Sequence, residues 1–197
     1  MSESTITKKA LSAGLKELMK TKSFGKISVA DIAGTCGLNR QTFYYHFQDK
    51  FALVNWIYYN ELISLISDDL TFENWDSRLC EILTIMKTNQ PFYQTTLKST
   101  ENNGFQNYLF TITRELLLDI ITRIAGPREV RPEHVVFLAE FYTFGIVGIV
   151  VQWAQKGMHE SPQELSMNLR TLVNESKKFA VERYYEENAE GAATAIT

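Results

Sequence analysis

The chain has 197 residues, of which 45% are hydrophobic and 22% are charged. This composition is ordinary for a globular protein and excludes a mainly disordered chain, and the length suffices for one large domain or two small ones. The two cysteines, Cys36 and Cys80, are too few for a disulfide framework or a metal cluster. We expect buried free thiols, and because no apolar N-terminal stretch follows a basic region, we expect no signal peptide and a cytoplasmic protein.

Charge is distributed unevenly along the chain. Residues 1–50 hold eight basic and four acidic side chains, a balance of +4, whereas residues 51–197 hold 12 basic and 19 acidic ones, a balance of −7. A basic N-terminal quarter on an acidic remainder is the asymmetry expected of a DNA-binding segment. A lysine-rich face exposed to solvent is the alternative, so charge alone does not decide the function.

Three helices are predicted at the start of the chain. The first, over about Thr7–Lys22, buries a stripe made of Leu11, Leu15, Leu18 and Met19. The second follows a capping box formed by Ser28 and Asp31. Gly37 suits the left-handed turn that ends this second helix. The third helix is capped at its start by an asparagine and covers Asn39–Phe47.

The second and third of these helices have the spacing of a helix-turn-helix, in which two short helices pack across a tight turn. The inward positions are apolar and comprise Val29, Ile32, Ala33, Leu38, Phe43 and Phe47. This pattern leaves Arg40, Gln41, Tyr44 and Tyr45 on the outer face. Arg40 can donate two hydrogen bonds to guanine, and Gln41 can pair with adenine. The sequence therefore predicts that this face reads DNA, although Arg40 as a plain surface charge is an alternative.

The remaining chain is also predicted to be helical. Asp49 caps a helix over roughly Lys50–Asp68, and longer helices are expected at Trp75–Thr88, Pro91–Ser99, Asn103–Ala125, Pro132–Lys156 and Pro162–Glu187. No segment shows the alternation of a strand, so the fold class is all-α. We divide the chain into a helix-turn-helix DNA-binding domain, a helical regulatory and dimerisation domain and a flexible tail, over residues 1–50, 51–187 and 188–197.

The stretch Val135–Val151 is almost continuously apolar. It has 17 residues, is interrupted by Glu140 and Thr143, and is shorter than the ~20 residues of a spanning helix, so we expect no membrane partner. A helix that is apolar all round is buried on both sides, and a second copy of the chain is the simplest cover. Gly145 and Gly148 permit close approach, in a dimer or within one chain. We predict a homodimer through the last two long helices, the second of which presents Leu165, Leu169, Leu172, Val173, Ser176 and Ala180.

The sequence Leu38-Asn-Arg-Gln-Thr-Phe-Tyr-Tyr-His-Phe-Gln-Asp-Lys50 resembles the most recognisable stretch of the TetR family of regulators, and the resemblance covers residues about 5–55. It implies a three-helix DNA-binding head, a connecting fourth helix, a ligand-binding body and a dimer built on the last two helices. It also implies base contacts by Arg40, Gln41 and Tyr44 and phosphate contacts by Thr42, Tyr45, His46 and Lys50. We add Ser28 to the phosphate contacts. For His46, packing or capping is the alternative.

A narrower resemblance concerns the branch of dihydroxyacetone-kinase regulators. It rests on three stretches, Leu38–Trp56, Phe144–Trp153 and Gly157–Leu165. Members of this branch are thought to control the use of dihydroxyacetone, and some bind a kinase-like coregulator protein. The resemblance therefore implies a link to dihydroxyacetone metabolism.

The body offers candidates for an effector pocket, namely Trp75, Met86, Phe92, Tyr93, Phe105, Tyr108, Tyr142 and Trp153. A mostly apolar cavity with a few polar groups suits a small organic molecule, although each of these side chains can equally fill the core. The chain has no nucleophile–base pair, metal-ligand spacing or glycine-rich loop that would indicate an enzyme, a metal site or a cofactor. We expect a dimeric regulator on a palindromic double-stranded DNA operator, controlled by a small-molecule effector or a coregulator protein. The alternative is a helical dimeric adaptor that acts mainly through protein contacts.

Overall fold

The computed structural model describes residues 3–65, 70–71, 73–98, 103–125 and 131–175. In these ranges every regular element is a helix, as the sequence predicts. The elements are α1 (Glu3–Met19), the 3-10 turn η1 (Phe24–Lys26), α2 (Val29–Thr35), α3 (Arg40–His46), α4 (Lys50–Glu61), η2 (Ile63–Leu65), α5 (Trp75–Thr88), α6 (Gln90–Lys98), α7 (Asn103–Ala125), α8 (Pro132–Gln155) and a last helix over residues 162–175. The predicted tail lies outside the described residues.

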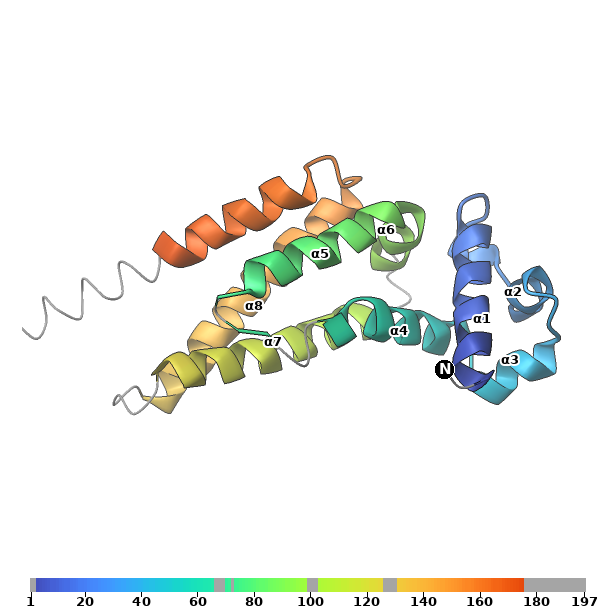
Figure 1. Cartoon of the computed structure of the whole chain (residues 1–197), viewed down its shortest axis with the longest axis horizontal. Helices are drawn as coiled ribbons and strands as arrows, with labels where there is room; N and C mark the ends of the chain where they lie inside the picture. Colours follow the sequence, from blue (N-terminus) through green and yellow to red (C-terminus); the bar gives the residue numbers. More distant parts are fainter. Residues whose placement is uncertain (1–2, 66–69, 72, 99–102, 126–130, 176–197) are drawn as a thin grey trace, which may run out of the picture.

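The helices α1, α2 and α3 form a head at one end of the molecule, and α4 leads from it into the body (Figure 1). Each short helix of the head starts at a capping side chain. The Ser28 hydroxyl accepts a bond from the Asp31 amide at 3.1 Å, and the Asn39 side chain accepts one from the Thr42 amide at 2.8 Å. Gly37 between them has a φ of +68°. These local bonds end one helix and start the next within a few residues.

The contact between α1 and α2 depends on a glycine. A Cβ atom at Gly14 would lie only 2.6 Å from the Cys36 sulfur, so only glycine lets the two helices approach this closely. The Cys36 thiol donates to the Ala10 carbonyl at 3.0 Å, and its partial burial raises the pKa of the thiol. Cys36 and Cys80 are both free and are only partly buried, whereas the sequence predicts full burial.

One continuous hydrophobic core runs from α1 to the last helix. The connecting helix α4 lies inside it, with Leu53 and Ile57 fully buried. The α-helix ends at Glu61, earlier than predicted, and η2 follows. The Ser64 hydroxyl donates to the Asn60 carbonyl at 2.9 Å, a local bond that competes with regular helical geometry.

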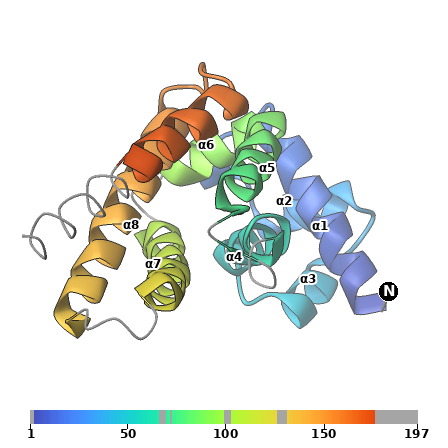
Figure 2. The ribbon, with the colours of Figure 1, turned by 60° about the vertical axis from the view of Figure 1, so that its left-hand side comes forward.

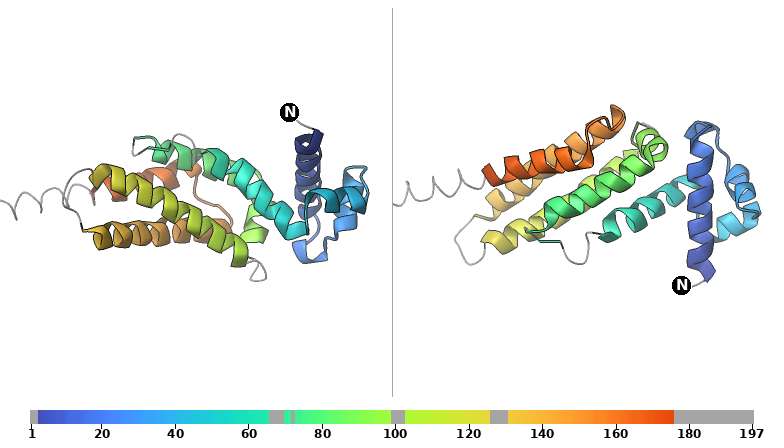
Figure 3. Two further views of the ribbon diagram at one scale, coloured as in Figure 1. Left: turned by 90° about the horizontal axis from the view of Figure 1, so that it is seen from below. Right: turned by 45° about the horizontal axis from the view of Figure 1, so that its top comes forward.

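The body is built around α7 and α8, which lie side by side (Figure 2). An ion pair between Arg114 and Glu140, at 3.2 Å, joins the two helices. The boundaries of α5 and α7 match the predicted ones, and those of α6 and α8 differ by a residue. The views in Figure 3 show α5 and the last helix on the same side of this pair.

The turn after α8 is held by several bonds. Gly157 and Met158 adopt φ values of +96° and +52°, and the Trp153 indole donates to the Glu160 carbonyl at 3.0 Å. Ser161 and Glu164 then form a second capping box, in which the Ser161 hydroxyl accepts from the Glu164 amide at 3.2 Å. The last helix is described to residue 175, and the rest of its predicted length lies outside the described residues.

Candidate DNA-binding surface and body cavity

The short helix α3 has one buried face and one exposed face. Phe43 is fully buried and Phe47 nearly so, and their ring centroids lie 5.8 Å apart. This anchor turns Tyr44 and Tyr45 outward, where 49% and 84% of their surfaces are exposed. Arg40 and Gln41 are exposed as well. The structure therefore brings the predicted readers together on the solvent side of one helix.

The polar groups on this face are available for a ligand. The Arg40 guanidinium lies 6.0 Å from the centroid of the Tyr44 ring, a geometry in which the ring holds the cation by a cation–π interaction. Neither the Arg40 nor the Gln41 side chain has a hydrogen-bond partner among the described residues. Gln41, Tyr45 and Thr42 also border a shallow surface depression beside Asn39. The exposed face of α3 thus carries side-chain donors without a partner among the described residues, on a helix anchored by Phe43 and Phe47.

Three of the residues predicted to contact phosphate, Thr42, Tyr45 and His46, also belong to α3. The Thr42 hydroxyl donates to the Asn39 side chain at 3.1 Å. His46 is half-buried, and its ring lies edge-on to Tyr45, with centroids 5.0 Å apart. The ring contact fits the packing role that the sequence analysis kept as an alternative for His46, and it leaves part of the imidazole accessible.

Ser28 lies at the start of α2, where its hydroxyl donates to the Asp31 carboxylate at 2.9 Å. The same carboxylate accepts from the Ser28 amide at 2.9 Å and pairs with Lys22 at 2.9 Å. These bonds, that from the Ser28 amide above all, lower the pKa of Asp31 to about 2. The hydroxyl of Ser28 is therefore part of the helix cap.

Lys50 is turned toward the protein. Its ammonium donates to the carbonyls of Phe24 and Ile27 at 2.9 Å each and to that of Gly25 at 3.4 Å. It also lies 4.6 Å from the centroid of the Phe24 ring. An ammonium has three hydrogens to donate, so these three carbonyls can occupy all of them. These bonds connect α4 to η1 and to Ile27, the residue between η1 and the cap of α2. No sequence pattern indicated this contact.

A polar contact joins the head to the body. The Lys16 ammonium of α1 donates to the Glu61 carboxylate of α4 at 2.6 Å, and the Tyr93 hydroxyl of α6 donates to the same carboxylate at 2.8 Å. Burial and the nearby charge of Glu61 raise the pKa of Tyr93. No sequence pattern indicated this contact, because its three members are far apart in the chain.

The body contains a cavity of about 470 Å³. It is bounded by α4, η2, α5, α6, α7, α8 and the last helix, and also by the residue Leu70. The lining includes four residues with polar atoms, Tyr58, Trp75, Thr113 and Tyr142, and otherwise consists of leucine, isoleucine, valine and methionine side chains. Among the described residues, no charged side chain lines it.

The residues predicted for an effector pocket fall into three groups. Trp75, Met86 and Tyr142 line the cavity. Three others do not line it. Phe92 and Tyr93 pack against the Tyr58 ring, with ring centroids 5.8 and 5.0 Å from its centroid. The Trp153 indole donates to the Glu160 carbonyl in the turn after α8. The side chains of Phe105 and Tyr108 lie outside the described part of the structure. Tyr58, which sequence reasoning missed, lines the cavity from α4.

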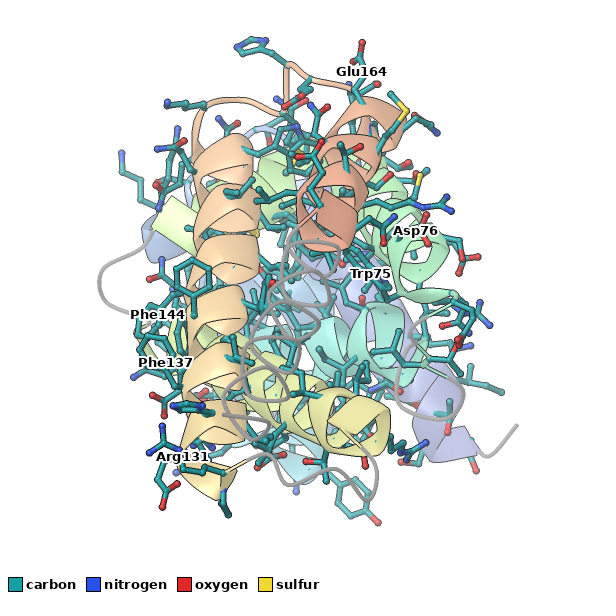
Figure 4. All side chains as sticks on the ribbon, turned by 90° about the vertical axis from the view of Figure 1, so that its left-hand side faces the viewer. Trp75, Asp76, Arg131, Phe137, Phe144 and Glu164 are labelled. Carbon is teal, nitrogen blue, oxygen red and sulfur yellow. The ribbon has the colours of Figure 1, made fainter. Side chains whose placement is uncertain are left out.

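The outer side of α8 carries large exposed aromatic side chains. Phe137, Phe141 and Phe144 are 65%, 63% and 65% exposed, and Figure 4 shows Phe137 and Phe144 projecting from the same outer side of the helix. Gly145 and Gly148 are exposed beside them, and added Cβ atoms there would meet nothing within 4 Å. The helix α8 is also long and apolar enough to cross a membrane, but the core helices of soluble proteins can have the same length and mean hydropathy. Exposed aromatic faces of this kind mark interaction surfaces.

Two family models match this chain. Residues 11–57 match the one described as bacterial regulatory proteins of the tetR family, and residues 73–175 match the one described as a transcriptional regulator C-terminal region. The first runs from the middle of α1 through α2 and α3 to Ile57 in α4, and the second covers the body from before α5 to the end of the described last helix.

A similar protein is the HTH-type dhaKLM operon transcriptional activator DhaS of Lactococcus lactis subsp. lactis (strain IL1403). It is 37% identical over 119 residues, which are 60% of this chain and 62% of that protein, so the match spans less than two thirds of it. The structure of a dihydroxyacetone kinase operon activator DhaS has a TM-score of 0.73 and 26% identity, over 89% of this chain and 98% of that one. NalD, the secondary repressor of the MexAB-OprM multidrug efflux pump in Pseudomonas aeruginosa, shares the fold, with a TM-score of 0.61 and 17% identity over 85% and 94% of the two chains.

Proposed function

Because the chain belongs to the TetR family of bacterial transcriptional regulators, we propose that two copies bind one palindromic operator and that each places α3 in a major groove. The two α3 helices then lie in successive grooves about 34–36 Å apart. The observation that carries this proposal is the outer face of α3, where polar and aromatic side chains project into solvent from a buried phenylalanine anchor.

Three side chains of α3 read bases in this proposal. Arg40 donates to guanine and Gln41 pairs with adenine, each pair contributing ~1–3 kcal/mol of discrimination. Tyr44 supports the Arg40 guanidinium through its ring and presents a ring edge to a thymine methyl. Preorganising Arg40 in this way reduces the entropy that it loses on binding.

The neighbouring side chains fix the position of the head on the DNA backbone. We assign phosphate contacts to Ser28, Thr42, Tyr45 and His46, which lie at the start of α2 and along α3. Lys50 keeps its positive charge near this surface, but its main role here is to hold η1 through three carbonyls. Backbone contacts of this kind set the register and carry no sequence information.

Dimerisation uses α8 and the last helix. Phe137, Phe141 and Phe144 follow the spacing of one helical face, and a second copy would cover them. Phe141→Glu should shift the protein from dimer to monomer in sedimentation velocity experiments, because burying a carboxylate among aromatic rings is unfavourable. Ile6→Glu, which alters an exposed apolar side chain of the head, is the matched control and should leave the dimer intact.

An effector or a partner protein controls operator occupancy through the body. The cavity is lined by Tyr58 of α4 and by Leu62 and Ile63, which directly follow this helix. The same helix is bonded to the head through Lys50 and Glu61. A ligand that binds more tightly when the two heads have the spacing of adjacent grooves favours that state and raises DNA affinity. A ligand that prefers another spacing lowers it.

The likeness to DhaS supports a more specific proposal. We propose that the chain is a cytoplasmic regulator of genes for dihydroxyacetone use, with either a small molecule in the body or a coregulator protein on its surface as the signal. The 37% identity to the DhaS of Lactococcus lactis over the aligned region supports this assignment. Mapping genomic binding sites tests it, because sites beside unrelated genes would contradict it.

DNA binding is tested by fluorescence anisotropy on a fragment taken from a mapped site. Arg40→Ala removes one guanine contact from each subunit, ~1–3 kcal/mol apiece, and should weaken binding of the dimer by about thirtyfold or more. Arg123→Ala on α7, which removes an exposed arginine far from the head, should not change it. Affinity should also fall steeply with salt, because the head displaces counterions from phosphates. An adaptor that acts only through protein contacts would show neither effect.

A further inference from the structure

The cavity in the body is large and almost entirely hydrocarbon-lined. Its volume of about 470 Å³ corresponds to about 16 groups of the size of a water molecule, at ~30 Å³ each. Leu117 and Ile121 contribute from α7, Ile82 from α5, and Val147 from α8. Such a lining favours an apolar occupant, because water in it would find few hydrogen-bond partners.

Three polar groups in the lining are free to bind an occupant. The Thr113 hydroxyl, the Tyr142 hydroxyl and the Trp75 indole N–H have no hydrogen-bond partner among the described residues. The fourth polar side chain, Tyr58, is bonded to the Thr96 hydroxyl at 2.6 Å. The cavity thus offers two hydroxyls, which donate or accept, and one indole, which only donates.

The absence of charge in this lining is as informative as its apolar surface. A buried carboxylate or phosphate without a cationic partner is strongly disfavoured, and no lysine, arginine or histidine lines the cavity as the structure describes it. Polyhydroxylated molecules are disfavoured as well, because three polar groups cannot satisfy many hydroxyls. The lining therefore selects against anions and against sugars.

We propose that this cavity binds an uncharged, mostly hydrocarbon molecule of about 16 non-hydrogen atoms with one or two neutral oxygens, such as a long-chain alcohol or ketone. Its oxygen bonds Thr113 or Tyr142, and its hydrocarbon part fills the rest. This inference rests on the proposed function, in which the body carries the regulatory site. Dihydroxyacetone, with as many oxygens as carbons, does not fit this cavity, so a response to it has to reach the chain through another surface.

The test uses the full-length protein and N-phenyl-1-naphthylamine, a neutral apolar probe whose fluorescence rises in apolar surroundings. We expect saturable binding of one probe per chain and displacement by 1-dodecanol. Dodecanoate at pH 8 should displace the probe at least about tenfold less effectively, because its charge would be buried without a partner. Dihydroxyacetone should not displace it.

Two variants locate the bound probe. Thr113→Trp places an indole in the cavity and should weaken probe binding by about tenfold or more, because the added ring occupies part of the space. Thr111→Trp makes the same change two residues away on the same helix, at an exposed position outside the cavity, and should bind as the wild type does. Circular dichroism checks that both variants keep the helical content of the wild type.

Three outcomes would overturn the inference: no saturable binding, equal displacement by dodecanol and dodecanoate, or unchanged binding to a folded Thr113→Trp. The third would place the probe elsewhere, for instance on the aromatic face of α8. The same titration repeated with operator DNA separates this inference from the proposed function. Dodecanol that binds without changing DNA affinity would support the cavity's ligand class and contradict its regulatory role.

Discussion

Lys50 allows the structure of the head to be tested by a single substitution. Lys50→Met keeps an unbranched, apolar side chain but removes the ammonium that bonds three carbonyls of residues 24–27. A hydrogen bond to a charged group contributes ~1.5–3 kcal/mol, and the contact with the Phe24 ring adds ~0.5–1 kcal/mol. Because Lys50 is only partly buried, water replaces some of these bonds, and we expect a net loss of about 2 kcal/mol.

Urea unfolding at fixed protein concentration, followed by circular dichroism, measures this loss. Lys26→Met is the matched control: Lys26 lies in the same turn and is exposed, and its ammonium has no bonded partner among the described residues, so its effect should stay within about 0.5 kcal/mol. The salt dependence of DNA binding gives the second readout. Unchanged stability of Lys50→Met, together with a salt slope reduced by about two, one for each subunit on the operator, would refute the structural role and make Lys50 a phosphate contact.

Three further predictions concern contacts in the head and at its junction with the body. The pKa of Asp31 is about 2 in the folded protein, below the ordinary 3.8, so its capping box stabilises the fold above about pH 4 and loses this effect as the pH falls toward 2; the difference in unfolding free energy between wild type and Asp31→Asn should vanish over that interval, and a constant difference would contradict the assignment. Glu61→Gln should cost about 1–3 kcal/mol in urea unfolding, whereas Glu17→Gln, at an exposed ion pair, should cost no more than about 0.5 kcal/mol; equal effects would count against the junction. Gly14→Ala should lower the melting temperature because its Cβ meets a thiol on α2, and Gly34→Ala, with open space around its Cβ, should not; a neutral Gly14→Ala would show that the helices are not packed so closely.

The order of the helices followed from local sequence signals. Ser28, Asn39 and Asp49 each cap the helix that the sequence assigns to them, and Gly37 takes the left-handed turn. Such signals act within a few residues, so they are readable without any knowledge of the tertiary structure. The sequence analysis did not predict the early end of α4. A hydrogen bond from Ser64 accompanies it, and nothing in the sequence distinguishes this serine from any other.

The candidate site was predictable only in part. The exposed face of α3 followed from the spacing of Phe43 and Phe47, a local pattern. The bonds of Lys50 and the contact of Lys16 with Glu61 join segments far apart in the chain, and no periodicity encodes such contacts. The lining of the cavity was likewise predicted only in part. The search for aromatic residues selected Trp153, whose indole donates to a carbonyl in the turn after α8, and overlooked Tyr58, which lines the cavity.

The central claim is that two α3 helices enter successive major grooves of one operator. Major-groove methylation protection on a mapped binding site tests it directly. The account predicts two protected patches centred about one helical turn apart, ~34–36 Å, both lost with Arg40→Ala at a protein concentration that only just saturates the site with wild type. A single protected patch, or protection that persists in Arg40→Ala at that concentration, would contradict it.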